Sequence, residues 1–374
     1  MNMRFGALIA ALVIFGAAIA PPALAKDDCR QPAQICETRS AVFRISAFDP
    51  VGSAVRIGPD LLVTSRHVVA HQEMVDLFLR DGSKLSAKVL PTAYEGDIIL
   101  LQTDGLGEGA QLKFGKVAKG GNVYTVGADV SRRRIRAYRP GKVRFLPAEG
   151  KPLARIHHSA YTQQGNSGGA LLNEDGELVG IAASGGEGRF EAVPASAVRL
   201  LIAERDEADR SASLEIGTAV RICTLNLERH YGSRRALNDQ EATALATSCR
   251  RTGNRQYFDL AGQILSQRRR LEPAMELFMA SVDQDPNAIN SRLNLVITHH
   301  IARRYEEELP HLRWLMEHAG NDLQVLRFAI QAGVWTDNME LAKEALTRMK
   351  AINPNAAPAA ERFMNSPPPR PPAN

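Results

Sequence analysis

The hydrophobic pattern of the chain changes its period once, close to Pro194, and this change constrains the fold more than any other feature. From Ala41 to about Val193, short alternating or apolar runs such as GSAVRI, DLLVT and DIILLQT are separated by Gly, Pro and Asp. Short strands at this spacing are typical of an antiparallel sandwich or barrel. From about Leu214 onward, apolar residues recur at helical spacing. We therefore expect an all-β domain followed by an all-α domain.

The length of 374 residues is enough for two such domains, at about 150 residues for each. With 44% hydrophobic and 23% charged residues, the composition excludes a wholly disordered, collagenous or coiled-coil chain. The charged stretch ERDEADRSA marks the boundary, so we predict the β domain over 41–205 and the helical domain from 214.

The first 25 residues have the order of a secretory signal. Arg4 precedes an apolar run from Phe5 to Ala20, and Ala23-Leu24-Ala25 forms a small-x-small cleavage site. We therefore predict a signal peptide over 1–25, an N-terminal segment over 26–40 and a periplasmic or secreted protein. An uncleaved membrane anchor is the alternative, and no other stretch could span a membrane.

The four cysteines are an even number in a chain expected to be exported, which favours disulfides. The pairs that are close in sequence are Cys29 with Cys36 and Cys223 with Cys249. Neither pair has the spacing of zinc ligands, so we predict no metal site.

The helical domain contains a 34-residue repeat. In successive copies, the position that normally takes a small residue holds Ala274, Glu308 and Ala342. The position that closes each copy holds Pro286, Gly320 and Pro354. The pattern resembles a tetratricopeptide array over 255–356 with a degenerate middle copy; an unrelated helical bundle is the alternative. Ahead of the array, we predict a helical hairpin over 214–252, which the second cysteine pair would staple. The proline-rich tail over 366–374 is expected to be disordered.

The string Gly-Asn-Ser-Gly-Gly at residues 165–169 carries the clearest chemical signal. A serine between glycines on a tight turn can expose its hydroxyl group, and the N–H groups of Gly165 and Ser167 can converge as an oxyanion hole. Such a serine needs a base and an orienting acid. His67 follows one predicted strand and Asp97 begins another, whereas the other histidines are less well placed.

His67 in TSRHVV, Asp97 in GDIILL and Ser167 in GNSGGALLNEDGELVGI resemble the three signature blocks of trypsin-like serine proteases of the HtrA (DegP-like) type. The resemblance covers roughly 41–204 and implies two packed six-stranded β-barrels with the catalytic cleft between them. It makes Ser167 the nucleophile, His67 the general base and acid, Asp97 the group that orients His67, and Gly165 with Ser167 the oxyanion donors.

The sequence departs from the family pattern in three places. Arg66 stands where the family usually has a small or amide residue, and Ala170 replaces a common proline. Helical repeats also follow where the family has a PDZ domain. Substrate capture, regulation and assembly therefore cannot be carried over.

The resemblance also indicates which residues form the specificity pocket. It places Tyr161 at the base of the primary pocket, beside Thr162. The absence of an acidic residue there favours small or medium apolar substrate side chains. Glu187 or Glu191 on the following loop could enter the pocket and change this preference.

The sequence as a whole predicts an exported serine endopeptidase that cleaves protein or peptide substrates and needs no cofactor, with helical repeats that bind substrates or partners. The alternative is a non-proteolytic repeat adaptor with a relic or zymogen-like protease domain. The basic runs, such as the one over 132–136, lack interleaved aromatic residues, so we predict no nucleic-acid binding. Because every candidate catalytic residue precedes residue 170, we expect the helical domain to be separable from the chemistry.

Overall fold

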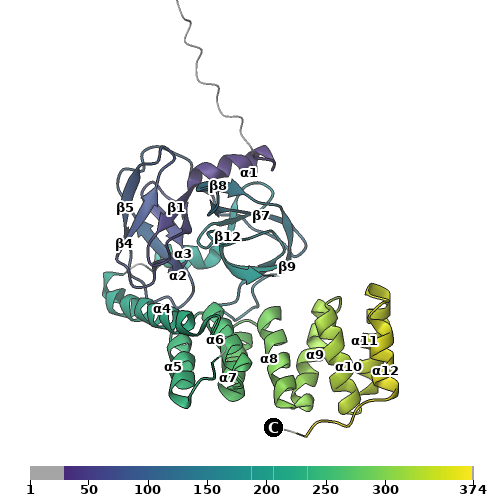
Figure 1. The fold of residues 1–374 in the computed structure, drawn as a ribbon. Coiled ribbons are helices and arrows are strands. Elements are labelled where there is room, and N and C mark those ends of the chain that lie inside the picture. The colour runs from purple at the N-terminus through teal and green to yellow at the C-terminus, as the bar shows by residue number, and fades with distance from the viewer. Residues whose placement is uncertain (1–28, 187, 205, 234, 373–374) are drawn as a thin grey trace, which may run out of the picture.

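The computed structural model describes residues 29–372, apart from residues 187, 205 and 234. The predicted signal peptide lies outside the described residues. Among these described residues, thirteen strands form a barrel half over 42–194, and the helices over 210–365 form a helical half that lies against it (Figure 1). No helix among the described residues is both long and apolar enough to cross a membrane.

The first six strands close into an antiparallel barrel in the order β1-β2-β3-β6-β5-β4. The strands are β1 (Val42–Ser46), β2 (Gly52–Arg56), β3 (Leu61–Thr64), β4 (Met74–Phe78), β5 (Lys84–Val89) and β6 (Ile99–Gln102). Ile45, Leu62 and Leu77 fill the barrel and are fully buried. A short helix, α2 (Arg66–Val69), follows β3 directly.

The second barrel closes because β7 pairs with both β9 and β11. Its strands are β7 (Asn122–Asp129), β9 (Gly141–Phe145), β10 (Ile156–His158), β11 (Ala170–Leu172), β12 (Leu178–Gly186) and β13 (Arg189–Pro194), and β8 (Arg134–Ala137) extends the sheet beside β7. The prediction of two six-stranded barrels is confirmed.

Short elements at both ends of the barrel half pack on the core that the two barrels share. Ile35 of α1 (Ala33–Glu37) and Val198 of α3 (Ala195–Ala203) are fully buried in this core. A 3₁₀ turn (Thr38–Ala41) leads from α1 into β1. The structure joins Cys29 to Cys36 beside α1.

A pair of long helices begins the helical half. Helices α4 (Arg210–His230) and α5 (Asp239–Arg250) are joined by the Cys223–Cys249 disulfide, and both cysteines are fully buried. Helix α4 also packs closely on the first barrel at Gly217, where an added Cβ would lie 2.2 Å from the carbonyl oxygen of Ala70. Ala70 follows α2, so α4 lies against the segment that carries His67.

The remaining helices repeat with a constant interval. They are α6 (Arg255–Gln267), α7 (Leu271–Gln284), α8 (Ile289–Ala302), α9 (Tyr305–Ala319), α10 (Leu323–Trp335), α11 (Met339–Ile352) and α12 (Ala357–Asn365). Helices α6, α8, α10 and α12 begin 34 residues apart, which is the period found in the sequence. The degenerate position Glu308 is fully buried, and its carboxylate accepts a hydrogen bond from His300 Nδ1 at 3.1 Å.

The proline-rich tail differs from the expectation of disorder over 366–372. Trp335 Nε1 donates to the carbonyl oxygen of Pro368 at 3.3 Å, and Arg370 pairs with Glu306 at 2.6 Å. The guanidinium group of Arg370 also lies over the ring of Tyr305. The aromatic surface of the last helices gives this extended segment a place to bind.

Candidate active site

His67 and Asp97 form a buried pair at the edge of the first barrel. His67 lies in α2, after β3, and Asp97 lies just before β6. His67 Nδ1 lies 2.8 Å from Asp97 Oδ2, and the backbone N–H of His67 donates to Asp97 Oδ1 at 3.0 Å. The carboxylate therefore fixes both the ring and the backbone of the histidine, and leaves Nε2 available for chemistry.

The electrostatics of this pair follow from burial and charge. Burial alone would lower the pKa of His67, but the attraction of Asp97 outweighs it and raises the pKa above its usual value. Burial would likewise raise the pKa of Asp97, but His67 and then Arg155 hold it below its usual range. Asp97 therefore stays ionised and His67 is a stronger base than a free imidazole.

Arg66, which departs from the family pattern, supports the segment that leads to Asp97. Its side chain is 2% exposed and donates to the carbonyl oxygens of Thr92 at 3.3 Å and Tyr94 at 2.9 Å. These residues belong to the loop ahead of Asp97. Burial lowers the pKa of Arg66 to about 10.

Ser167 lies in the loop between β10 and β11, facing the cleft between the barrels. Its carbonyl oxygen accepts from the N–H of Ser53 on β2 at 2.8 Å, which ties the loop to the first barrel. Asn166 is fully buried and its side chain donates to the carbonyl oxygen of Ala128 at 3.0 Å, which ties the loop to the second barrel. Ser167 Oγ lies 3.5 Å from the carbonyl oxygen of Ala183 and lines the same cavity as His67.

The turn before Ser167 sets the direction of the predicted oxyanion donors. The N–H of Asn166 donates to the carbonyl oxygen of Gln163 at 3.0 Å, and Gly165 has a φ of 90° at the third position of this turn. A residue other than glycine rarely adopts this angle. Among the described residues, no backbone hydrogen bond engages the N–H of Gly165 or of Ser167. Both donors are therefore available to a substrate oxygen.

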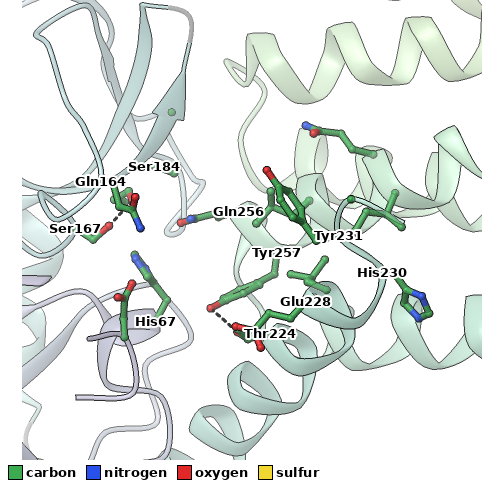
Figure 2. A pocket seen from close by; sticks show the side chains of 18 of the residues that line it. His67, Gln164, Ser167, Ser184, Thr224, Glu228, His230, Tyr231, Gln256 and Tyr257 are labelled. Carbon is green, nitrogen blue, oxygen red and sulfur yellow. Dashed lines mark hydrogen bonds between the residues drawn. The ribbon is translucent and has the colours of Figure 1, made fainter. Parts of the chain in front are cut away.

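The cavity has walls from both halves of the protein and a volume of about 920 Å³. His67, Gln163, Gln164, Ser167 and residues 183–185 form its barrel side, and Thr224, Leu227, Glu228, Gln256, Tyr257, Leu260 and Gln263 of α4 and α6 face them. Figure 2 shows Gln256 reaching from α6 toward Ser167 and His67. The helical half thus forms a wall of the candidate active site.

The predicted specificity residues are placed differently from one another. Thr162 lines the cavity, and its hydroxyl lies 3.1 Å from that of Thr125. Tyr161 is not among the lining residues: it is 41% exposed and its ring packs near Tyr138 and Phe190. Glu191 is buried in ion pairs with Arg155 and Arg255, so it does not enter the pocket. Glu187 lies outside the described residues.

Sequence reasoning missed the residues that α6 contributes. Asn254 caps this helix by accepting from the N–H of Gln256 at 3.0 Å, and this cap sets the direction of Gln256 and Tyr257. On α4, Thr224 Oγ1 donates to the phenol oxygen of Tyr257 at 3.1 Å (Figure 2). The one local signal is the asparagine cap, which predicts where a helix begins but not what it faces.

Comparisons with known proteins agree with this geometry. Residues 52–181 match the family described as the trypsin-like peptidase domain. The chain is 29% identical over 201 residues to serine protease HTRA1B of Danio rerio, which covers 50% of this chain and 42% of that protein. It is 30% identical over 175 residues to the periplasmic pH-dependent serine endoprotease DegQ of Escherichia coli K12. That match covers 41% of this chain and 37% of DegQ. It thus spans less than half the length of these relatives.

Among solved structures, the inactive form of the Rv3671c protease of M. tuberculosis covers 51% of this chain and 99% of that chain. The sequence identity is 22% and the TM-score is 0.41.

Proposed function

Because residues 52–181 match the trypsin-like peptidase domain, we propose that this protein is a serine endopeptidase that cleaves polypeptides through an acyl-enzyme. The observation that carries the proposal is the 2.8 Å contact between His67 Nδ1 and Asp97 Oδ2 at the cavity that Ser167 also lines. A relic domain would have no reason to keep this arrangement.

In the proposed mechanism, His67 Nε2 takes the proton of Ser167 as the hydroxyl oxygen attacks the substrate carbonyl. Asp97 holds the imidazole in the required tautomer and stabilises the imidazolium that forms. The N–H groups of Gly165 and Ser167 stabilise the negative oxygen of the tetrahedral intermediate. His67 then donates the proton to the leaving amine, and water releases the acyl group by the same steps in reverse.

The end of β12 offers a place for the substrate main chain. Among the described residues, 184–186 pair with β13 only, so the opposite edge of this segment is unpaired beside the cavity. An extended peptide can add to such an edge as a further strand. The proposal therefore has the substrate bound through its backbone, which suits an enzyme for unfolded chains.

The helical repeats, which we propose to be tetratricopeptide-like, would hold more of the same substrate. A second cavity of about 500 Å³ shares six lining residues with the first and continues along α6 and α8. Its lining includes the carboxamides of Gln263, Gln267, Asn290, Asn294 and Gln324. Carboxamide groups can both donate to and accept from a peptide backbone. These side chains would bind an extended segment without requiring a particular sequence.

We further propose that the protein is exported to the periplasm or secreted. The order of residues 1–25 and the two disulfides favour an oxidising compartment. The named relative DegQ is a periplasmic protein.

The proposal is tested by incubating the purified protein and its Ser167→Ala variant with fluorescently labelled, unfolded casein and, separately, with a fluorophosphonate probe. We expect the wild type to cleave casein and to be labelled, and the variant to do neither. A wild type that is folded but neither cleaves nor is labelled would favour the non-proteolytic adaptor.

Substrate binding by the second cavity, along α6 and α8, can be tested separately from the chemistry. The double variant Asn290→Ala/Asn294→Ala should slow casein cleavage but leave labelling by the small probe unchanged, because these two side chains line the second cavity and not the one that holds His67 and Ser167. Gln102→Ala, an exposed amide on the first barrel, is the matched control. Equal casein cleavage by all three proteins would remove the repeats from substrate binding.

A further inference from the structure

Arg155 lies at the point where the two barrels and the helical half meet. It directly precedes β10 and is 4% exposed. Its Nη1 donates to Ser184 Oγ on β12 at 2.7 Å and to Glu191 Oε2 on β13 at 3.3 Å. Its Nη2 lies 4.0 Å from Asp97 Oδ2 in the first barrel. One guanidinium group therefore connects the catalytic aspartate to the second barrel.

The helical half supplies the remaining partners of Arg155. Asn254 Oδ1 accepts from Arg155 Nη2 at 2.9 Å, and Asp285 Oδ2 accepts from the backbone N–H of Arg155 at 3.1 Å. Asn254 caps α6 and Asp285 follows α7, so both belong to the helix pair α6–α7. The position of Arg155 thus depends on the docked helices.

Further buried charges hold this seam together. Arg255, 2% exposed, donates to Glu191 and lies 3.5 Å from Asp285 Oδ2. His157 Nε2 lies 2.7 Å from the same carboxylate oxygen. Buried charges are costly unless they are paired with good geometry. The Arg255–Glu191 and His157–Asp285 pairs each join the helical half to the barrel half. A seam built in this way favours one arrangement of the two halves.

We propose that Arg155 is a positioning residue for the Asp97–His67 pair and that the helical half, through Asn254 and Asp285, holds it there, so that hydrolysis depends on docked helices. This inference rests on the proposed function. Arg155 acts through Asp97, since its guanidinium places a positive charge beside a carboxylate that is 2% exposed.

The inference reverses the expectation that the helical half is separable from the chemistry. That expectation followed from the chain positions of the candidate residues, all of which precede residue 170. Arg155 also precedes residue 170, but two of its partners lie at 254 and 285. Loss or displacement of the helices would release the arginine and weaken the support of Asp97.

A pH profile separates this role from a merely structural one. The charged and titratable groups around the Asp97–His67 pair are Asp49, Arg66, Tyr94, Arg155 and Tyr257. The positive charge of Arg155 lowers the pKa of His67, against the larger raising effect of Asp97. Removing that charge should therefore raise the pKa of His67 and move the acid limb of activity to higher pH.

The experiment measures the rate of fluorophosphonate labelling against pH for the full-length mature protein. Arg155→Met should slow labelling by up to about 100-fold, because a small misplacement of catalytic groups is enough for such a loss. Its acid limb should also lie at higher pH than in the wild type. Arg155→Lys, which keeps the charge, should recover part of the acid-limb position.

A second variant keeps the test decisive if Arg155→Met does not fold. Asn254→Ser retains a helix-capping hydroxyl but is too short to reach Arg155. We expect it to move the acid limb in the same direction by a smaller amount. Arg189→Met is the matched control, because it breaks the ion pair between Arg189 and Asp322, 2.9 Å apart, that also joins the two halves.

The possible outcomes are distinct. If Asn254→Ser and Arg155→Met keep the wild-type rate and acid limb, Arg155 does not position Asp97 and the inference is overturned. If Arg189→Met moves the acid limb equally, the effect is one of general docking, and the specific role of Arg155 is lost. A wild type that is not labelled at any pH would instead refute the proposed function.

Discussion

Replacing Gly217 by alanine tests how closely helix α4 is packed on the first barrel. In the interior of a helix, alanine is normally about 1 kcal/mol more favourable than glycine. At this position, however, the new Cβ would lie 2.2 Å from the carbonyl oxygen and 2.7 Å from the carbonyl carbon of Ala70. Ordinary contact begins at 3.4 Å, so α4 would have to move by about 1 Å.

Whether Gly217→Ala raises or lowers stability depends on the balance between the gain in helix propensity and the cost of the close contact. Overpacking of a close contact costs typically about 1–3 kcal/mol, and the atoms in the way are backbone atoms of a residue with a φ of 52°. We therefore expect Gly217→Ala to lower the free energy of unfolding by about 1 kcal/mol, where helix propensity alone predicts a gain of that size.

Urea unfolding followed by far-ultraviolet circular dichroism measures this change. Glu215→Ala, two residues away on the exposed side of α4, is the control and should stay within about 0.5 kcal/mol of the wild type. An increase in stability of Gly217→Ala by about 1 kcal/mol would refute the reasoning, because it would mean that α4 does not rest on Ala70.

Two further predictions concern the helical half. The double variant Cys223→Ala/Cys249→Ala should lose about 3 kcal/mol of stability, because the disulfide closes a loop with a sequence separation of 26. The double variant Cys29→Ala/Cys36→Ala should lose less, because its separation is 7. Equal denaturation midpoints for the wild type and both variants would contradict this prediction. Burial raises the pKa of Glu308 from 4.5 to about 7, so the unfolded chain ionises first and stability present below pH 4.5 is lost as pH rises toward 7. Glu308→Gln should therefore gain thermal stability relative to wild type at pH 8 but not at pH 4, and an identical difference at both values would exclude Glu308 as the cause.

The sequence predicts those features that local patterns determine. Alternating strands and the glycine-flanked Ser167 are visible because barrel strands and tight turns impose residue types within a few positions. The 34-residue interval is visible because each repeat has to bury the same face. Even the degenerate copy keeps this interval, since Glu308 is accommodated by a hydrogen bond from His300 rather than by a change of backbone.

What the sequence could not predict depends on contacts between distant segments. In the sequence, Arg155 is an ordinary residue just before a strand, and the role proposed for it depends on Asp97, Asn254 and Asp285, which lie up to 130 residues away. The same holds for Gln256 and Tyr257, whose place in the cavity is set by how α6 docks. The tail over 366–372 has a composition typical of disorder, and its partners Tyr305, Trp335 and Glu306 come from helices that precede it by more than 30 residues.

The two tryptophans of this protein both lie in the helical half. One is near the contact with the barrels, and the other is at the contact with the tail. The ring of Trp314 stacks near Phe145 of β9, with centroids 6.0 Å apart, whereas Trp335 donates to the tail at Pro368. Because the barrels contain no tryptophan, intrinsic fluorescence excited at the red edge of absorption reports on the helices alone. Single Trp314→Phe and Trp335→Phe variants would give the protein separate optical signals for release of the helices from the barrels and for release of the tail.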